Sequence, residues 1–248
     1  MRTATVLMSC ALAAAAPAHA GALAGETLPP ASDVVALFEF DGSALDSSGN
    51  GRHAELIGGS FGQGRYGNVL RVRYLPEEGD VVAPMGIDWS AHADLLVHPY
   101  TVEMVFTSYT EGGEPTSGYQ KLFSPDDAED NGWYIVDGDF EAYPTAFYLG
   151  DERIRHDQVI YLAIVSTSED EIEVFFNGQS IGTSGKGFFG TPLQAIFFQD
   201  DAQTTRGEQL QADVEVLRIS DVARNAGEIA AIAERFPFFG SGFEPTGL

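Results

Sequence analysis

The 248-residue sequence contains a single cysteine, Cys10, and it lies in an N-terminal segment that we expect to be removed. Residues 1–20 begin with one arginine, continue as an apolar run and end in Ala18-His19-Ala20, a small-x-small pattern typical of signal-peptide cleavage. We therefore expect a secreted or periplasmic protein that is cleaved near Ala20. The mature chain would then have no disulfide bond and no thiol chemistry.

The sequence also lacks an apolar run long enough for a convincing membrane span, because residues 1–20 are short and rich in alanine. We expect no membrane insertion. One alternative stays open, since Leu7-Met8-Ser9-Cys10 loosely resembles a lipid-attachment motif. In that case the protein would be a lipoprotein.

Basic side chains are scarce, with 13 lysines and arginines against 37 aspartates and glutamates. Removal of residues 1–20 takes away only Arg2, which leaves 12 basic against 37 acidic residues and a formal net charge of −25. A field of this sign repels phosphate backbones and anionic lipids, so we expect no nucleic-acid partner. Cations and neutral ligands such as sugars remain compatible, and solubility alone would also account for the charge.

Common catalytic patterns are missing as well. The five histidines do not have metal-site spacing, and the sequence has neither a nucleophile elbow at Ser48 nor a glycine-rich phosphate loop. Glu171 and Glu173 share one face of an expected strand, as a pair of glycosidase acids could. Because they lie beside an expected hairpin at Asn177-Gly178, an ordinary solvent-exposed strand is the alternative interpretation.

What the sequence does contain is a repeated alternation of apolar and polar residues, which predicts strands. The expected strands cover residues 34–40, 69–74, 100–106, 133–136, 145–149, 159–165, 171–176, 195–198 and 214–219. The segment 159–165 has no polar alternation, so it should be a central strand covered on both faces. Asn177-Gly178 predicts a type I′ hairpin turn, because both residues tolerate positive φ.

One helix is expected near the C-terminus. Asn225 and Glu228 have the spacing of a capping box ahead of apolar Ile229 and Ile232. Many short strands followed by one short helix predict an all-β, two-sheet antiparallel sandwich. The expected organisation is a linker over residues 21–33, one β-sandwich domain over residues 34–236 and a tail over residues 237–248.

Four stretches together resemble laminin-G-like, concanavalin-A-like jelly-roll domains of secreted bacterial proteins. They are FEFDGSALDSSGNGRHAEL at 38–56, GQGRYGNVLRV at 62–72, VIYLAIVSTSEDEIEVFFNGQSIGT at 159–183 and VEVLRISDVARNAGEI at 214–229. The resemblance implies a jelly roll whose first and last strands are adjacent. It also implies the binding of glycans or surface polymers more often than catalysis, and a structural Ca²⁺ near the opening loop.

The opening loop contains oxygen-bearing side chains suited to calcium. Asp41, Asp46 and Asn50 could supply side-chain ligands, and the neighbouring glycines could turn backbone carbonyls inward. The alternative is a plain turn, in which these side chains accept hydrogen bonds from backbone N–H groups.

Two acids on the closing strand bear on this choice. Uninterrupted alternation would place Asp213 and Glu215 on the same face as apolar Leu217, where a lone carboxylate is costly. If the terminal strands pair as the resemblance implies, Glu215 or Asp213 could approach the opening loop, and a bound Ca²⁺ would satisfy both. The alternative is an arginine partner, for which the candidates are Arg71, Arg73 and Arg218.

Sugar binding would use exposed aromatic rings. The candidates in or beside expected loops are Trp89, Tyr109, Trp133 and Tyr143, and for each of them the alternative is a place in the core. We expect a secreted, non-catalytic recognition module that binds an extracellular glycan or a surface protein. The alternatives are a glycan-cleaving hydrolase of the same fold and a structural or assembly protein with a broad apolar patch and no small ligand.

Overall fold

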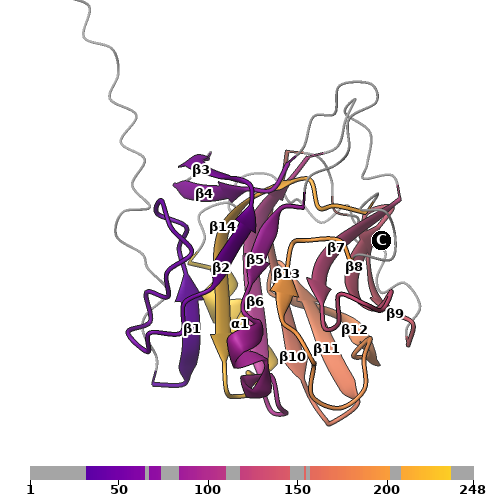
Figure 1. The fold of residues 1–248 in the computed structure, drawn as a ribbon. Coiled ribbons are helices and arrows are strands. Elements are labelled where there is room, and N and C mark those ends of the chain that lie inside the picture. Colours follow the sequence, from indigo (N-terminus) through magenta and orange to yellow (C-terminus); the bar gives the residue numbers. More distant parts are fainter. Residues whose placement is uncertain are drawn as a thin grey trace, which may run out of the picture.

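The computed structural model describes residues 32–64, 67–73, 84–109, 118–145, 154, 157–201 and 208–235. The expected signal peptide, most of the linker, the expected strand after Thr145 and the C-terminal tail lie outside the described residues. The described chain forms two antiparallel sheets packed as a sandwich, with one short α-helix (Figure 1). The predicted fold class is therefore confirmed. No helix in the described ranges is long and apolar enough to cross a membrane.

The larger sheet has eight strands. Seven follow the order β12-β11-β10-β6-β14-β4-β3, and β1 also pairs with β14. Their bounds are β1 (Val34–Phe38), β3 (Ser60–Gln63), β4 (Asn68–Arg71), β6 (Thr101–Ser108), β10 (Val159–Ser166), β11 (Glu171–Phe176), β12 (Gln179–Gly185) and β14 (Ala212–Ser220).

The smaller sheet has six strands in the order β2-β5-β13-β7-β8-β9. Their bounds are β2 (Glu55–Gly58), β5 (Gly86–Asp88), β7 (Tyr119–Ser124), β8 (Gly132–Val136), β9 (Asp139–Tyr143) and β13 (Ile196–Phe197). A 3₁₀ segment η1 (Ser90–Leu95) follows β5, and helix α1 (Ala226–Ala233) follows β14.

The first and last strands of the sandwich lie side by side, as the resemblance implied (Figure 1). β1 runs antiparallel to β14, with Val34 opposite Ser220 and Phe38 opposite Leu217. Strand β6 pairs with one edge of β14 along its whole length. The opposite edge of β14 is shared: β1 pairs with its C-terminal part, and β4 pairs with Asp213 and Val214.

Strand β10 is covered on both faces, which confirms the prediction for this segment. Ile160, Leu162 and Ile164 belong to the main core between the sheets. On the opposite face, Tyr161 and its neighbours form a second cluster with Ile229 of helix α1.

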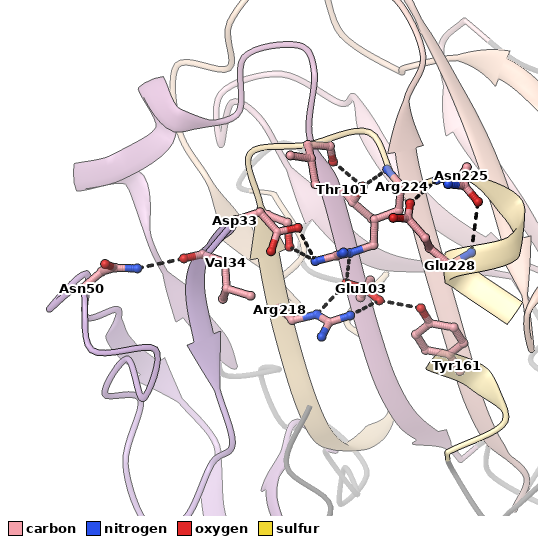
Figure 2. A network of polar contacts seen from close by, with 12 residues as sticks. Asp33, Val34, Asn50, Thr101, Glu103, Tyr161, Arg218, Arg224, Asn225 and Glu228 are labelled. Atoms are coloured by element: carbon pink, nitrogen blue, oxygen red, sulfur yellow. Dashed lines mark hydrogen bonds and ion pairs between the residues drawn. The ribbon is translucent and has the colours of Figure 1, made fainter. Parts of the chain in front are cut away.

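The predicted local signals at the hairpin and at the helix are also confirmed. Asn177 and Gly178 have φ values of 50° and 87°, the left-handed pair that a type I′ turn requires. The Asn225 side chain accepts hydrogen bonds from the backbone N–H groups of Gly227 and Glu228, and the Glu228 side chain accepts one from the Asn225 N–H (Figure 2).

Candidate functional site

Asp46 organises the opening loop through backbone hydrogen bonds. Its carboxylate accepts from the N–H groups of Leu37, Ser48 and Arg52 at 3.0, 2.8 and 2.9 Å. Burial alone would raise the pKa of Asp46, but these hydrogen bonds outweigh it and lower the pKa below its usual value. This is the plain-turn arrangement, in which the carboxylate holds the loop together.

The other two candidate ligands of this loop turn elsewhere. The Asn50 amide nitrogen donates to the carbonyls of Val34 and Val35 at 2.8 and 3.1 Å, so its nitrogen and not its oxygen faces β1 (Figure 2). Asp41 is exposed and borders a pocket of about 220 Å³. The pocket is lined by Asp41, Gly42, Phe61, Gly62, Gln63 and Asn68.

A bulge in β14 corrects the predicted placement of Asp213 and Glu215. Val214 lies opposite Phe106 and Val216 lies opposite Val105, so Glu215 is an extra residue in the pairing with β6. The prediction of one shared face with Leu217 was wrong, because it assumed uninterrupted alternation. Val214 and Leu217 both reach the main core, whereas the two acids do not share that face.

Arginine is the partner of Asp213, as the alternative interpretation held. Asp213 Oδ1 lies 3.4 Å from Arg73 Nε and 3.8 Å from Arg71 Nε. Glu215 is 6% exposed; Thr107 Oγ1 lies 3.3 Å from its Oε1, and its Oε2 has no hydrogen-bond partner among the described residues. Burial raises the pKa of Glu215 to about 8, and hydrogen bonds from Thr107 and its own backbone oppose this only in part.

The predicted calcium ligands therefore do not converge in this arrangement. Within the described ranges, no three Asp, Glu, His or Cys side chains form a group that could hold a metal ion. Calcium needs six to eight oxygens at about 2.3–2.6 Å. As placed here, the set Asp41, Asp46, Asn50, Asp213 and Glu215 does not fit a single calcium site, and calcium binding stays a prediction.

A separate cluster of buried, mutually paired charges links strands of the larger sheet. Glu103 on β6 accepts two hydrogen bonds from Arg218 at 2.6 and 2.5 Å and one from the Tyr161 hydroxyl at 2.5 Å (Figure 2). Arg224 lies 3.5 Å from the same carboxylate and pairs with Asp33, next to β1, at 2.9 Å. Since its charges are already paired, the cluster clamps β1, β6 and β14 and leaves little for a ligand.

The acid pair considered for hydrolysis lies on strand β11, beside the hairpin to β12. Glu171 is exposed, and Glu173 Oε1 accepts a hydrogen bond from Ser180 across the β11–β12 hairpin at 2.6 Å. This is the ordinary solvent-exposed strand of the alternative interpretation.

The four aromatic candidates have different environments. Trp89 and Trp133 are fully buried, and their indoles donate to the carbonyls of Arg52 and Lys186 at 2.9 Å each. The Arg73 guanidinium lies over the Tyr109 ring, with the guanidinium carbon 4.7 Å from the centre of that ring. Tyr143 alone is among the more exposed large side chains, at 37%.

Tyr143 belongs to a group of three tyrosines on the smaller sheet, which we call the tyrosine face. Tyr119 on β7, Tyr134 on β8 and Tyr143 on β9 lie on the surface that is turned away from the core; these three strands are neighbours in the sheet (Figure 1). Tyr134 is 1% exposed and stands edge-on to Tyr119 and Tyr143, with ring centres 5.7 and 6.4 Å apart. Two half-exposed rings therefore flank a buried one.

The floor of the tyrosine face is polar and charged. Lys121 is fully buried; its ammonium donates to the Tyr134 hydroxyl and pairs with Asp201 at 2.8 Å. The Tyr134 hydroxyl in turn donates to Asp130 at 2.7 Å. Burial raises the pKa of Tyr134 far above its usual value and Asp130 adds to the shift, so the phenol stays protonated.

Two glutamates complete this surface. Glu141 lies opposite Tyr134 in the β8–β9 pairing and is 7% exposed, and burial and the charge of Asp130 raise its pKa. Burial raises the pKa of Glu208 to about 7, assisted by Asp200 and Asp130. Both carboxylates lie close enough to Asp130 to respond to its charge.

Most of this site was missed by the sequence reasoning, which named only Tyr143 among its residues. Strands β7 and β9 were not predicted, although alternation was present in both: Tyr119 and Lys121 face outward, as do Glu141 and Tyr143. No local sequence pattern could predict that Glu208 lies beside β7. Its backbone carbonyl accepts a hydrogen bond from the Lys121 N–H, and this contact exists only in the folded chain.

No protein-family model and no curated protein matches the sequence. Solved structures with similar folds were found. Domain 4 of AbnA, an extracellular GH43 arabinanase from Geobacillus stearothermophilus in complex with arabinotriose, has a TM-score of 0.56 at 16% identity and covers 81% of this chain and 98% of its own. The binding domain of botulinum neurotoxin serotype D has a TM-score of 0.58 at 12% identity.

A structure of botulinum neurotoxin type C, described as entering cells through interaction with two ganglioside molecules, has a TM-score of 0.51 at 9% identity. The present chain spans about half the length of these toxin structures, 52% for serotype D and 51% for type C. At these identities the similarity shows the β-sandwich fold alone.

Proposed function

We propose that this protein is a non-catalytic recognition module that binds carbohydrate through the tyrosine face. The observation that carries the proposal is the arrangement of Tyr119 and Tyr143, 38% and 37% exposed, on either side of the buried Tyr134. Flat aromatic rings pack against the apolar faces of sugar rings.

The similar structures support this proposal. One is a domain of an arabinan-degrading enzyme that was captured with a trisaccharide, and another belongs to a toxin that interacts with gangliosides. Non-catalytic binding agrees with the exposure of Glu171 and with the hydrogen bond that Glu173 accepts from Ser180. The laminin-G-like family and a secreted location remain part of the proposal and rest on the sequence.

The test is a glycan array probed with the wild-type protein and with Tyr143→Ala and Tyr119→Ala. Each truncation should weaken glycan binding by about tenfold, the order expected when one aromatic contact is lost. Phe189→Ala is the matched control, because Phe189 is 80% exposed but lies after β12, outside the tyrosine face. Unchanged binding by both tyrosine variants, or no bound glycan at all, would reject the proposal.

A chelator arm separates calcium from sugar recognition. The tyrosine face needs no metal for recognition, so glycan binding should persist in EDTA. If EDTA instead lowers the melting temperature, the structural Ca²⁺ of the resemblance gains support without affecting the site. Loss of glycan binding in EDTA with an unchanged fold would assign recognition to a metal and not to the tyrosines.

A further inference from the structure

The three rings of the tyrosine face lie on one diagonal across β7, β8 and β9. Tyr119 is opposite Val136 in the β7–β8 pairing, and Tyr143 is opposite Gly132 in the β8–β9 pairing. Tyr134 lies midway between Val136 and Gly132 on β8, two residues from each. Tyr119 and Tyr143 are therefore both diagonal neighbours of Tyr134, and they lie on opposite sides of it.

This register sets the separation of the two exposed rings. Neighbouring strands are about 4.8 Å apart and advance about 3.4 Å per residue, so the Cα atoms of Tyr119 and Tyr143 are about 17 Å apart. The ring centres lie closer together, at 5.7 and 6.4 Å from the ring centre of Tyr134. Because the two rings are on opposite sides of Tyr134, their centres are separated by up to about 12 Å, the sum of these distances.

Tyr134 keeps the two exposed rings apart. Its own ring is 1% exposed and stands at 88° to Tyr119 and 89° to Tyr143, edge-to-face arrangements that stabilise aromatic pairs. Its hydroxyl accepts a hydrogen bond from the Lys121 ammonium and donates one to Asp130 at 2.7 Å. A ring that is held through both its edges and its hydroxyl acts as a spacer, so the spacing of the exposed rings is set before a ligand binds.

A single sugar residue is too small to contact both exposed rings. A six-membered sugar ring is built from bonds of about 1.5 Å, so each residue advances a chain by about 5 Å. Tyr134 fills the position between the two rings on β8, where a sugar clamped between them would have to lie. The first and third residues of a chain are about 10 Å apart, which is close to the separation of the rings.

We propose that the tyrosine face binds a run of at least three consecutive residues of a glycan chain, with Tyr119 and Tyr143 stacked on two different residues. This inference rests on the proposed function and deepens it, because it assigns the ligand as an oligomer and not as a single terminal sugar. Each ring offers its exposed part to the apolar face of one residue. Both contacts act on one molecule, so the second forms at a high effective concentration and raises the affinity of the longer ligands selectively.

The decisive experiment titrates the full chain with fragments of one, two, three and five residues, prepared from the glycan that binds best on the array. The ring resonances of Tyr119 and Tyr143 are followed by NMR. The three-residue fragment should shift both sets of resonances with one common dissociation constant. It should bind at least about tenfold more tightly than the single sugar, the gain from a second aromatic contact. The five-residue fragment should add little, because both rings are already covered.

Variants of one tyrosine separate a shared ligand from two independent sites. Tyr143→Ala should weaken binding of the three-residue fragment by about tenfold, but it should reduce single-sugar binding by no more than about half, since Tyr119 still binds one residue. Tyr143→Phe keeps the ring and should retain most of the preference for the longer fragment. Phe189→Ala removes a ring that is 80% exposed after β12 and should leave the length dependence unchanged. Thermal unfolding of each variant checks that the fold is intact.

The outcomes distinguish the two proposals. If the single sugar binds as tightly as the longer fragments and Tyr143→Ala weakens both about tenfold, the length requirement is rejected and carbohydrate recognition stands. The same holds if the two-residue fragment binds as tightly as the three-residue fragment, or if the latter shifts the resonances of one tyrosine only. If Tyr143→Phe loses as much binding as Tyr143→Ala, the hydroxyl makes the contact and ring stacking is wrong. If no glycan on the array binds, both proposals are rejected.

Discussion

At the scale of single residues, Glu215 is a buried carboxylate that has little compensation for its burial. The bulge in β14 places it beside Thr107 with 6% exposure, away from the arginines that pair with Asp213. Its pKa rises from 4.5 to about 8, mainly through burial. Because the unfolded chain releases this proton first, Glu215 lowers the free energy of unfolding progressively between about pH 4.5 and pH 8.

Glu215→Gln should remove this pH-dependent loss. At pH 4.5 the variant and the wild type should be about equally stable, since both side chains are neutral when folded. At pH 8.5 the variant should be more stable by a few kcal/mol, given about 1.4 kcal/mol per pKa unit. Urea denaturation at the two pH values measures the difference. A variant that is less stable than the wild type at pH 8.5 would contradict this prediction. It would show that Glu215 is ionised in the folded protein and has a partner, which could be a cation.

At the scale of elements, the β11–β12 hairpin is fitted closely against helix α1. A Cβ atom added at Gly178 would lie 2.7 Å from the Cβ of Ala233, in addition to the strain of a φ near 87°. Gly49 has a similar φ of 91°, but nothing lies within 4 Å of a Cβ placed there. The two positions therefore separate backbone strain from helix contact.

Gly178→Ala should be clearly more destabilising than Gly49→Ala. The latter should cost about 1 kcal/mol, the strain of a left-handed residue with a side chain. Gly178→Ala should cost about twice as much or more, because helix α1 must shift away from the apolar cluster that it forms with Tyr161 of β10. Melting temperatures of the two variants provide the comparison. Equal losses would mean that the hairpin does not support the helix.

Sequence patterns identified the elements that carry strong local signals. Each of these signals lies within a few consecutive residues, and those residues alone determine the local structure. The examples are the apolar run of β10, the Asn177-Gly178 turn and the Asn225 capping box. The bulge at Glu215 could not be anticipated, because an extra residue leaves no mark in the alternation and appears only in the pairing with β6. The arginine partners of Asp213 were anticipated as an alternative, since burial of a carboxylate demands a counter-charge.

The candidate site, in contrast, could hardly be predicted from local sequence patterns. The opening loop had the more conspicuous composition, yet Asp46 and Asn50 use their side chains to secure the loop and β1. The tyrosine face is built on the consecutive strands β7, β8 and β9, and Glu208 reaches β7 from a distant part of the chain. The position of Glu208 depends on the folded chain, which no single stretch of sequence specifies.

At the scale of the whole molecule, the pairing of β1 with β14 closes the sandwich and the buried Glu103–Arg218 cluster fixes that closure (Figure 2). On the outward face of β7, β8 and β9, Tyr119 and Tyr143 are exposed, and these are the rings that the proposed recognition would use. The strong negative charge of the chain then biases its ligands toward neutral or cationic partners. The fold, the charge and the tyrosine face are thus all compatible with the proposed carbohydrate recognition. Each of the three features alone would be compatible with several functions.

The most direct measurement of the central claim is a map of backbone amide chemical shifts upon addition of a glycan identified on the array. We predict that the largest changes occur at Tyr119, Glu141, Tyr143 and their strand neighbours, and that Tyr143→Ala suppresses them. Changes concentrated instead at the pocket beside Asp41 and Phe61 would contradict the assignment of carbohydrate recognition to the tyrosine face.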